Sequence, residues 1–260
     1  MLLASTILLI GYTHAFHSND VNEAFYAQEN NHQYMSLVQL IGFQDTPPVD
    51  RSTRLLHSKL IFRPNDGPNE CAWTYVVCDG QGIVRSITWS DWTVALPSGL
   101  NLHWLPQTLE RVRIENIYFT SSQPFSIRNL PKAALEVTLD SCNIPGTPDL
   151  TALPAHLESL SLRQNCLTGT VLFTELPQAI QTIDLRGNFI EVVVVDNSAL
   201  PMAFRKAHVS SRNGRVKVHG VEVSGDPIDA RISLYSVNRQ GLEVDQNGNP
   251  FVHAWRSENY

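Results

Sequence analysis

The chain has 260 residues, with 19 basic and 25 acidic side chains and a formal net charge of −6. This acidic balance suits a soluble protein and disfavours nucleic acid as the main partner, because nucleic-acid binding requires a basic surface. The length is large for one ordinary domain but suits a repeat solenoid with capped ends.

The first 15 residues have the pattern of a secretory signal peptide. An apolar run from Leu2 to Tyr12 is followed by Thr13-His14-Ala15, which places a small residue before a cleavage point. The alternative is an uncleaved anchor, but an anchor needs about 20 apolar residues to span a bilayer. We therefore expect removal of residues 1–15 and a product that is secreted or held at the extracellular surface, with no membrane span of its own.

Residues 16–83 are expected to form a mainly helical N-terminal cap. Asp20 and Glu23 have the spacing of a capping box, and apolar side chains recur at helical spacing as far as Ile41, before a proline pair at 47–48. The stripe could serve a membrane or a partner helix. Docking on the first coil of a solenoid is the favoured alternative, because an open coil must be covered.

One sequence motif recurs six times between residues 84 and 212. The plainest copies are Leu157-x-x-Leu160-x-Leu162-x-x-Asn165 and Ile180-x-x-Ile183-x-Leu185-x-x-Asn188, and looser copies begin at Val84, Leu109, Ala134 and Phe204. A Leu-Pro pair precedes each of the last five copies, with its prolines 25, 23, 23 and 24 residues apart. A fixed period of this length predicts one stacked unit per coil.

Each unit should contribute one strand. Apolar residues two apart, as in Leu160-x-Leu162, lie on one face of a strand, and that face becomes the shared core. Strands of successive units then align in parallel along the inside of the solenoid. The intervening side chains point outward in rows.

The repeat resembles that of leucine-rich repeat proteins, specifically the roughly 24-residue type of plant extracellular receptors. The segments 142–148 (CNIPGTP) and 165–171 (NCLTGTV) look like the Asn-x-Leu-x-Gly-x-Ile-Pro stretch of that class. Repeat-bearing surface proteins of kinetoplastid protists are similar in general type. The resemblance implies an α/β repeat solenoid with a parallel sheet on its concave face, a helical N-terminal cap and a β-rich C-terminal cap. It also implies that Asn165 and Asn188 hydrogen-bond neighbouring backbones.

The cysteines fall into two pairs. Cys71-x-Trp73 with Cys78 resembles the N-terminal cap of plant-type repeat ectodomains, which implies a Cys71–Cys78 disulfide and packing of Trp73 over the open end of the core. A metal site is disfavoured because no second close cysteine pair completes it. Cys142 and Cys166 should be near neighbours in adjacent coils. A bridge between them is one alternative, and two free buried thiols are favoured because their side chains should point differently.

Residues 213–260 should cap the second end with β-structure. Alternating residues on either side of His219-Gly220 predict a hairpin with its turn at that pair. The segment 232–237 fits either a strand of this cap or a degenerate seventh repeat.

Catalytic motifs are missing from the sequence, which has no Gly-x-Ser-x-Gly, no His-Glu-x-x-His and no phosphate-binding glycine loop. We therefore expect a protein that is not an enzyme and needs no cofactor or metal. The remote alternative is a hydrolase at Asp184 and His208, which should face each other about 5 Å apart on adjacent strands. Ser161 lies one coil earlier, but the aspartate would then lie between serine and histidine, whereas a catalytic histidine must contact the nucleophile.

The outward rows favour recognition of a protein, peptide or glycan, because they mix short polar side chains with charges of both signs. A merely solvated face is one alternative. Another is a structural surface or matrix protein that assembles through its repeats without a dedicated ligand. Inward signalling would require a membrane co-receptor. The expected ligand-binding residues of the concave face are Arg111, Arg113, Glu136, Thr138, Ser161, Arg163, Asp184, Arg186 and His208.

Overall fold

The computed structural model describes residues 30–40, 70–90, 100–117, 125–214, 216–220, 228–237 and 243–244. The predicted signal peptide and the expected capping box lie outside these ranges. Within them, none of the helices is long and apolar enough to cross a membrane.

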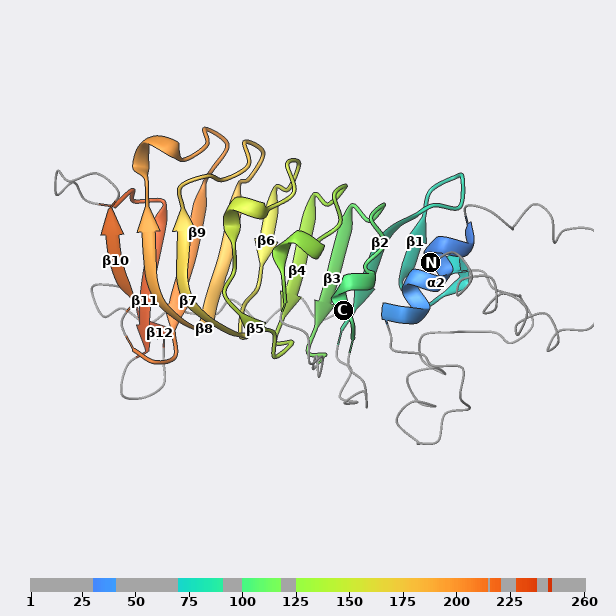
Figure 1. The fold of residues 1–260 in the computed structure, drawn as a ribbon, viewed down its shortest axis with the longest axis horizontal. Helices are drawn as coiled ribbons and strands as arrows, with labels where there is room; N and C mark the ends of the chain where they lie inside the picture. The colour runs from blue at the N-terminus through green and yellow to red at the C-terminus, as the bar shows by residue number, and fades with distance from the viewer. Residues whose placement is uncertain are drawn as a thin grey trace, which may run out of the picture.

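The described chain winds into a parallel β-solenoid, with strands lying side by side along the long axis (Figure 1). Strand partners in successive coils are 22 to 25 residues apart, which agrees with the period of the sequence. The main sheet has the order β1-β2-β3-β4-β6-β8-β9-β11-β12. Its strands are β1 (Val76–Cys78), β2 (Val84–Trp89), β3 (Arg111–Glu115), β4 (Glu136–Asp140), β6 (Ser159–Ser161), β8 (Thr182–Val195), β9 (Lys206–Ser211), β11 (Ile232–Val237) and β12 (Glu243–Val244).

A second parallel sheet covers the opposite side of the later coils. It contains β5 (Pro145–Gly146), β7 (Cys166–Phe173), the second half of β8 and β10 (Lys217–Gly220). The 14 residues of β8 take part in both sheets, and its pairing shifts register between Leu185 and Asn188. A run of valines, Val192 to Val195, favours this extended return because β-branched side chains prefer strands.

Short 3-10 helices, rather than α-helices, lie on the return path in several described coils, and two of them directly follow strands of the second sheet, β5 and β8. They are Leu102–Trp104, Ile127–Asn129, Leu150–Ala152 and Asn197–Ala199, and Glu70–Ala72 is a fifth in the cap. A Leu-Pro pair directly follows each of the four, and the residue before a proline is pushed out of the helical region. The α/β character implied by the resemblance is therefore reduced in the described chain to one α-helix, α2 (Asn30–Leu40).

The core is a single apolar cluster along the whole solenoid. Leu160, Leu162, Ile183 and Leu185 are all at most 1% exposed, so the predicted inward face of the repeat strands is confirmed. The side of the main sheet turned away from this core is called the outward face below.

The first coil is covered by α2, as the sequence favoured. Leu37 and Leu40 are fully buried, and the Gln33 side-chain oxygen accepts a hydrogen bond of 2.8 Å from the Val84 amide at the start of the first repeat. The Tyr34 ring meets Trp73 edge-on at 5.9 Å. Cys71 and Cys78 are joined in the predicted disulfide.

Two buried asparagines tie neighbouring coils together, as the resemblance implied. The Asn165 side-chain oxygen accepts from the amides of Cys142 and Ile144, while its nitrogen donates to the carbonyls of Leu139 and Arg163. Asn188 does the same one coil later, accepting from the Leu167 amide and donating to the carbonyls of Leu162 and Leu185.

A left-handed residue precedes this ladder position in four consecutive coils. Asn116, Ser141, Gln164 and Gly187 have φ values of 60°, 56°, 54° and 69°. The first three amides donate to carbonyls of the next coil, those of Asp140, Arg163 and Arg186, at 2.8 to 3.0 Å. This recurring corner turns each chain segment away from the main sheet.

The C-terminal prediction is corrected in one respect. His219 and Gly220 are strand residues of β10, paired in parallel with Val194 and Val195, so they do not form the turn of a hairpin. The residues expected to form its second strand lie outside the described chain. β11 pairs with β9 in parallel, with Ala207 opposite Ile232, and so adds the further coil that was one of the two alternatives. β12 pairs with β11 in antiparallel fashion.

Candidate functional site

The outward face carries the predicted rows of side chains in the expected register. Arg111 lies opposite Glu136, and Arg113 lies opposite Thr138, which in turn lies opposite Ser161. Asp184 then follows Ser161, and His208 follows Asp184. The structure therefore brings the predicted residues together on one surface, but it divides them into an exposed group and a buried group.

The exposed group lies on β3 and β4. The side chains of Arg111, Arg113 and Glu136 are 54 to 56% exposed. Arg111 Nε lies 3.7 Å from the Glu136 carboxylate, whereas Arg113 pairs at 3.2 Å with Glu115, which is only 15% exposed. Surface ion pairs of this kind contribute little stability, so these guanidinium groups can exchange their partners for a ligand.

The buried group centres on the Asp184 carboxylate. Arg186 Nε donates to both of its oxygens, at 2.9 and 3.1 Å, and a terminal nitrogen of Arg186 also bonds to Oδ2. Arg163 Nε lies 3.7 Å from the same carboxylate. The arginine side chains are only 10% and 7% exposed, and both lie within ion-pair distance of the same Asp184 carboxylate. We conclude that Arg163 and Arg186 support the surface and offer a ligand little contact area.

Asp140 is held by the neighbouring coil. Ser161 Oγ donates to its carboxylate at 2.6 Å, and the Arg163 amide donates to the same oxygen at 2.9 Å. Burial raises the pKa of Asp140 above its ordinary value, while these two hydrogen bonds oppose the shift.

His208 contacts the last coil. Its Nδ1 lies 3.1 Å from the Tyr235 hydroxyl, and the two rings are 5.6 Å apart. Burial, followed by the positive charge of Arg186, lowers the pKa of His208 below its ordinary value.

These contacts bear on the remote hydrolase alternative. Asp184 and His208 are strand partners, as the sequence predicted. The Ser161 hydroxyl, however, points its hydrogen bond at Asp140, and the Asp184 carboxylate is engaged by two arginines. These contacts engage Ser161 and Asp184 with partners other than His208.

Two exposed residues of the cap extend the outward face and were missed by the sequence reasoning. Val77 of β1 lies opposite Ser86, in the row that continues through Arg111, and it is 58% exposed. Tyr75 is 65% exposed, has a φ of 60°, and accepts a hydrogen bond from the Thr88 amide through its carbonyl. The available signal was the short extended run Tyr75-Val76-Val77 before the first repeat, because alternate residues of a strand face opposite sides.

Both remaining cysteines are free, as favoured. Cys142 is buried, with its thiol directed at the carbonyls of Ile114 and Asp140, and burial raises its pKa to about 12. Cys166 is only partly buried, which corrects the expectation of two buried thiols. Its thiol donates to the Asn143 side-chain oxygen at 3.0 Å.

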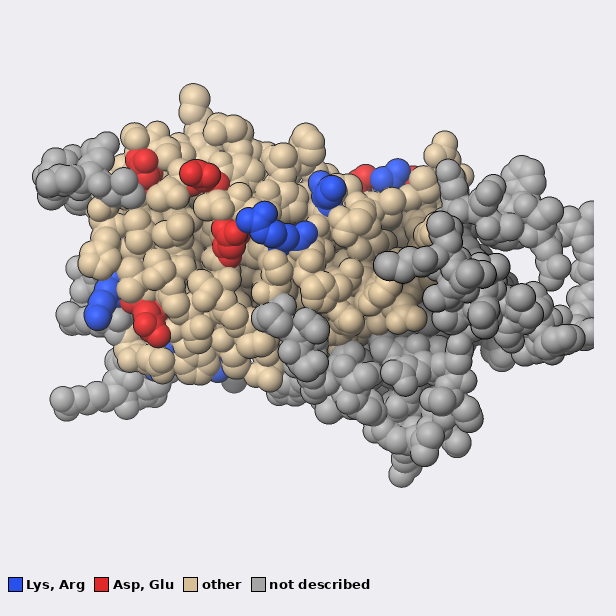
Figure 2. Space-filling model, viewed as in Figure 1, with Lys and Arg blue, Asp and Glu red and all other residues tan. Residues whose placement is uncertain are grey.

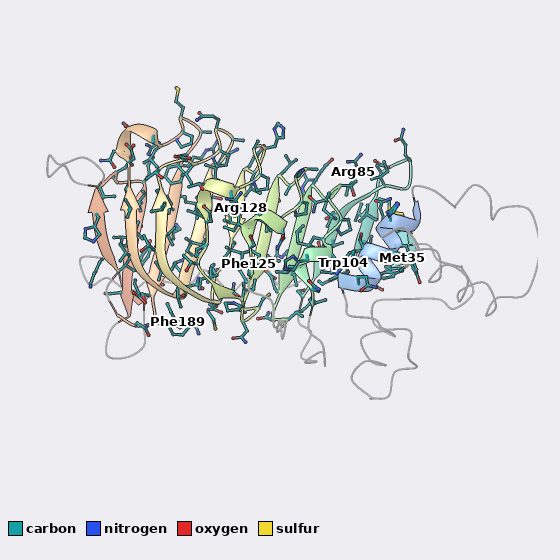
Figure 3. The ribbon with its side chains drawn as sticks, viewed as in Figure 1. Met35, Arg85, Trp104, Phe125, Arg128 and Phe189 are labelled. Atoms are coloured by element: carbon teal, nitrogen blue, oxygen red, sulfur yellow. A yellow bond between two sulfur atoms is a disulfide. The ribbon has the colours of Figure 1, made fainter. Side chains whose placement is uncertain are left out.

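The opposite side of the molecule differs in character. Figure 2 shows the side on which Figure 1 draws the 3-10 helices, with charged side chains scattered over the part that is described. The ion pair of Arg128 with Asp149, at 3.2 Å, lies near its centre, where Figure 3 labels Arg128. On the second sheet the exposed Leu172 lies opposite Val194.

Among the described residues, no group of three or more His, Cys, Asp or Glu side chains could hold a metal ion. No protein-family model matches the chain, and no curated protein matches it.

Proposed function

We propose that the chain is an exported recognition module of the leucine-rich repeat type, which binds a protein, peptide or glycan on its outward face without covalent chemistry. The repeat type is supported by coils of 23 to 25 residues and by the ladder bonds of Asn165 and Asn188. Export is supported by the Cys71–Cys78 disulfide, because such bonds persist in oxidising compartments.

The observation that carries the binding proposal is the exposed pair of arginines on a rigid sheet. Arg111 and Arg113 keep more than half of their side-chain surface in contact with solvent, beside Glu136, on a sheet whose other face is buried in the apolar core. A preorganised surface with charges of both signs favours specific recognition, because complementary charges steer and orient a partner.

Charge reversal tests this proposal. The full chain is screened on peptide and glycan arrays beside the Arg111→Glu/Arg113→Glu variant and a matched Arg128→Glu/Lys217→Glu control. Both substituted pairs are exposed, but the control residues lie outside the main sheet. We expect binding to disappear only in the first variant, with an unchanged melting temperature in both. Equal binding by all three proteins would remove the outward face from consideration.

A second candidate function is structural, with assembly through the repeats and no dedicated ligand. It is favoured by the exposed Leu172 beside Val194 on the second sheet. It predicts a mass that rises with concentration in sedimentation and a constant monomer mass for Leu172→Asp. A constant mass for the unsubstituted chain would exclude assembly through this sheet.

A further inference from the structure

We propose that the partner is an acidic peptide segment with an apolar side chain, and that it docks at the N-terminal end of the outward face. The inference rests on the proposed recognition function and specifies its partner and its place. The docking surface, called the Tyr75 surface below, consists of Tyr75, Val77, Ser86, Thr88, Arg111 and Arg113.

Strand pairing makes this surface continuous. Val77 lies opposite Ser86, which lies opposite Arg111, while the Tyr75 carbonyl is bonded to Thr88 in the neighbouring row. Adjacent strands are about 4.8 Å apart, so Val77 and Arg111 are separated by about 10 Å. An extended peptide advances about 3.3 Å per residue, and three or four residues therefore bridge the apolar and the basic parts.

The apolar part consists of Tyr75 and Val77. Trp73 and Val76, beside them in sequence, are buried at 4% and 8% exposure, whereas Tyr75 and Val77 are turned to solvent. A bulky residue with φ near 60° is an unfavoured arrangement, and residues held in such conformations gather at binding sites. The short chains of Ser86 and Thr88 leave the ring and the valine accessible from the adjacent strand.

The charge of the partner is inferred from the basic part of the Tyr75 surface, Arg111 and Arg113. Arg111 and Arg113 are the exposed cations here, and the only comparably exposed anion beside them among the described row partners is Glu136. Glu115, the ion-pair partner of Arg113, is largely covered. Arg113 therefore presents its charge to solvent while its own partner is covered, and the carboxylates of a peptide can replace these weak surface partners of Arg111 and Arg113. Exposed tyrosine and arginine together are also the residues that most often dominate the affinity of protein interfaces. A neutral glycan offers no carboxylate to exchange for those of Glu136 and Glu115.

Peptide selection tests the inference directly. Random 12-residue peptides displayed on phage are selected on the immobilised full chain, and the enriched peptides are measured by fluorescence anisotropy. We expect enrichment of Asp or Glu near Leu, Phe or Tyr. Tyr75→Gly should weaken binding at least tenfold without loss of fold, because glycine adopts a φ of 60° readily. Arg111→Glu/Arg113→Glu should have a similar effect, and Lys206→Glu, far along the same row, should have none.

Three other results would contradict the inference, and they differ in which part of it they contradict. Enriched peptides that are basic or lack apolar residues would overturn the partner chemistry. Acidic peptides whose affinity depends on Lys206 but not on Tyr75 would show that the peptide docks elsewhere than the Tyr75 surface. The proposed recognition function of the outward face would be unaffected. If no peptide is enriched, the inference fails, and a glycan array with the same protein then decides whether the proposed recognition function fails as well.

Discussion

Arg186 donates hydrogen bonds to both carboxylate oxygens of Asp184, the residue two positions before it on the same strand. Residues two apart on a strand share a face, so this ion pair lies along β8 and not across neighbouring strands. The ion pair covers part of the outward face that a ligand would otherwise contact, and the Arg186 side chain is only 7% exposed. The pair therefore belongs to the internal support of the outward face.

Removal of one partner of this pair should be costly. Arg186→Met leaves the Asp184 carboxylate covered and stripped of its main partner, so we expect a loss of about 2–4 kcal/mol in the free energy of unfolding in urea. Asp184→Asn/Arg186→Met should recover part of that loss, because the carboxylate is removed together with its main partner, although Arg163 then loses its ion pair with Asp184. The control Arg111→Ala removes a half-exposed cation and should cost less than about 0.5 kcal/mol. A cost for Arg186→Met as small as that of the control would contradict the support role.

The buried amide of Asn165 should be equally sensitive. Asn165→Leu leaves the amides of Cys142 and Ile144 buried without their acceptor, and each such group costs about 1–3 kcal/mol. We expect a loss of about 3 kcal/mol, measured by urea unfolding. Thr168→Ala, an exposed position in the same coil, serves as the control and should change stability by less than about 0.5 kcal/mol. A tolerated leucine would mean that the ladder bond contributes little.

The architecture follows from periodicity, and for that reason the sequence predicted it well. Apolar residues two apart fix which side of each strand is buried, and the constant period fixes which residues become neighbours. The rows through Arg111, Thr138 and Asp184 therefore have the register that was expected.

The burial of individual charged residues could not be predicted in the same way. Whether Arg163 and Arg186 are exposed depends on how their long side chains fold back onto Asp184, and a strand pattern does not encode side-chain direction along the sheet. The exposed Tyr75 was missed for a related reason, since the disulfide segment was treated only as a cap. The replacement of α-helices by single 3-10 turns follows from the Leu-Pro pairs, whose effect on helix length was not drawn from the sequence.

His208 should make stability depend on pH near neutrality. Its pKa in the folded chain lies below the ordinary value of 6.5, so the unfolded chain binds more protons just below pH 6.5. Stability is therefore present above that pH and falls as the pH drops through the window. Arg186, Lys206 and Arg163 strengthen the effect, and the Asp184 carboxylate opposes it.

Urea unfolding at several pH values between about 5.5 and 7 measures this slope. It should be a fraction of the roughly 1.4 kcal/mol per pH unit of a full proton difference, because His208 is only half-buried and solvent screens its charge. His208→Asn should flatten the slope, whereas Tyr235→Phe retains the imidazole and should retain the slope. An identical slope in the His208 variant would assign the effect to another group.

The two free cysteines should differ sharply in reactivity. With a pKa of about 12, Cys142 has only about one thiolate in 10⁴ molecules at pH 8, and its thiol is buried against the carbonyls of Ile114 and Asp140. Iodoacetamide should therefore alkylate only Cys166 in the native chain, giving a single added group by mass spectrometry. Both thiols should react after unfolding in urea without reductant, because the disulfide holds only Cys71 and Cys78.

Cys166→Ser should abolish native labelling, while Cys142→Ser should leave it unchanged. Labelling of Cys142 in the native chain would show that the third repeat opens readily, and failure of both thiols to react after unfolding would show that they are bridged to each other.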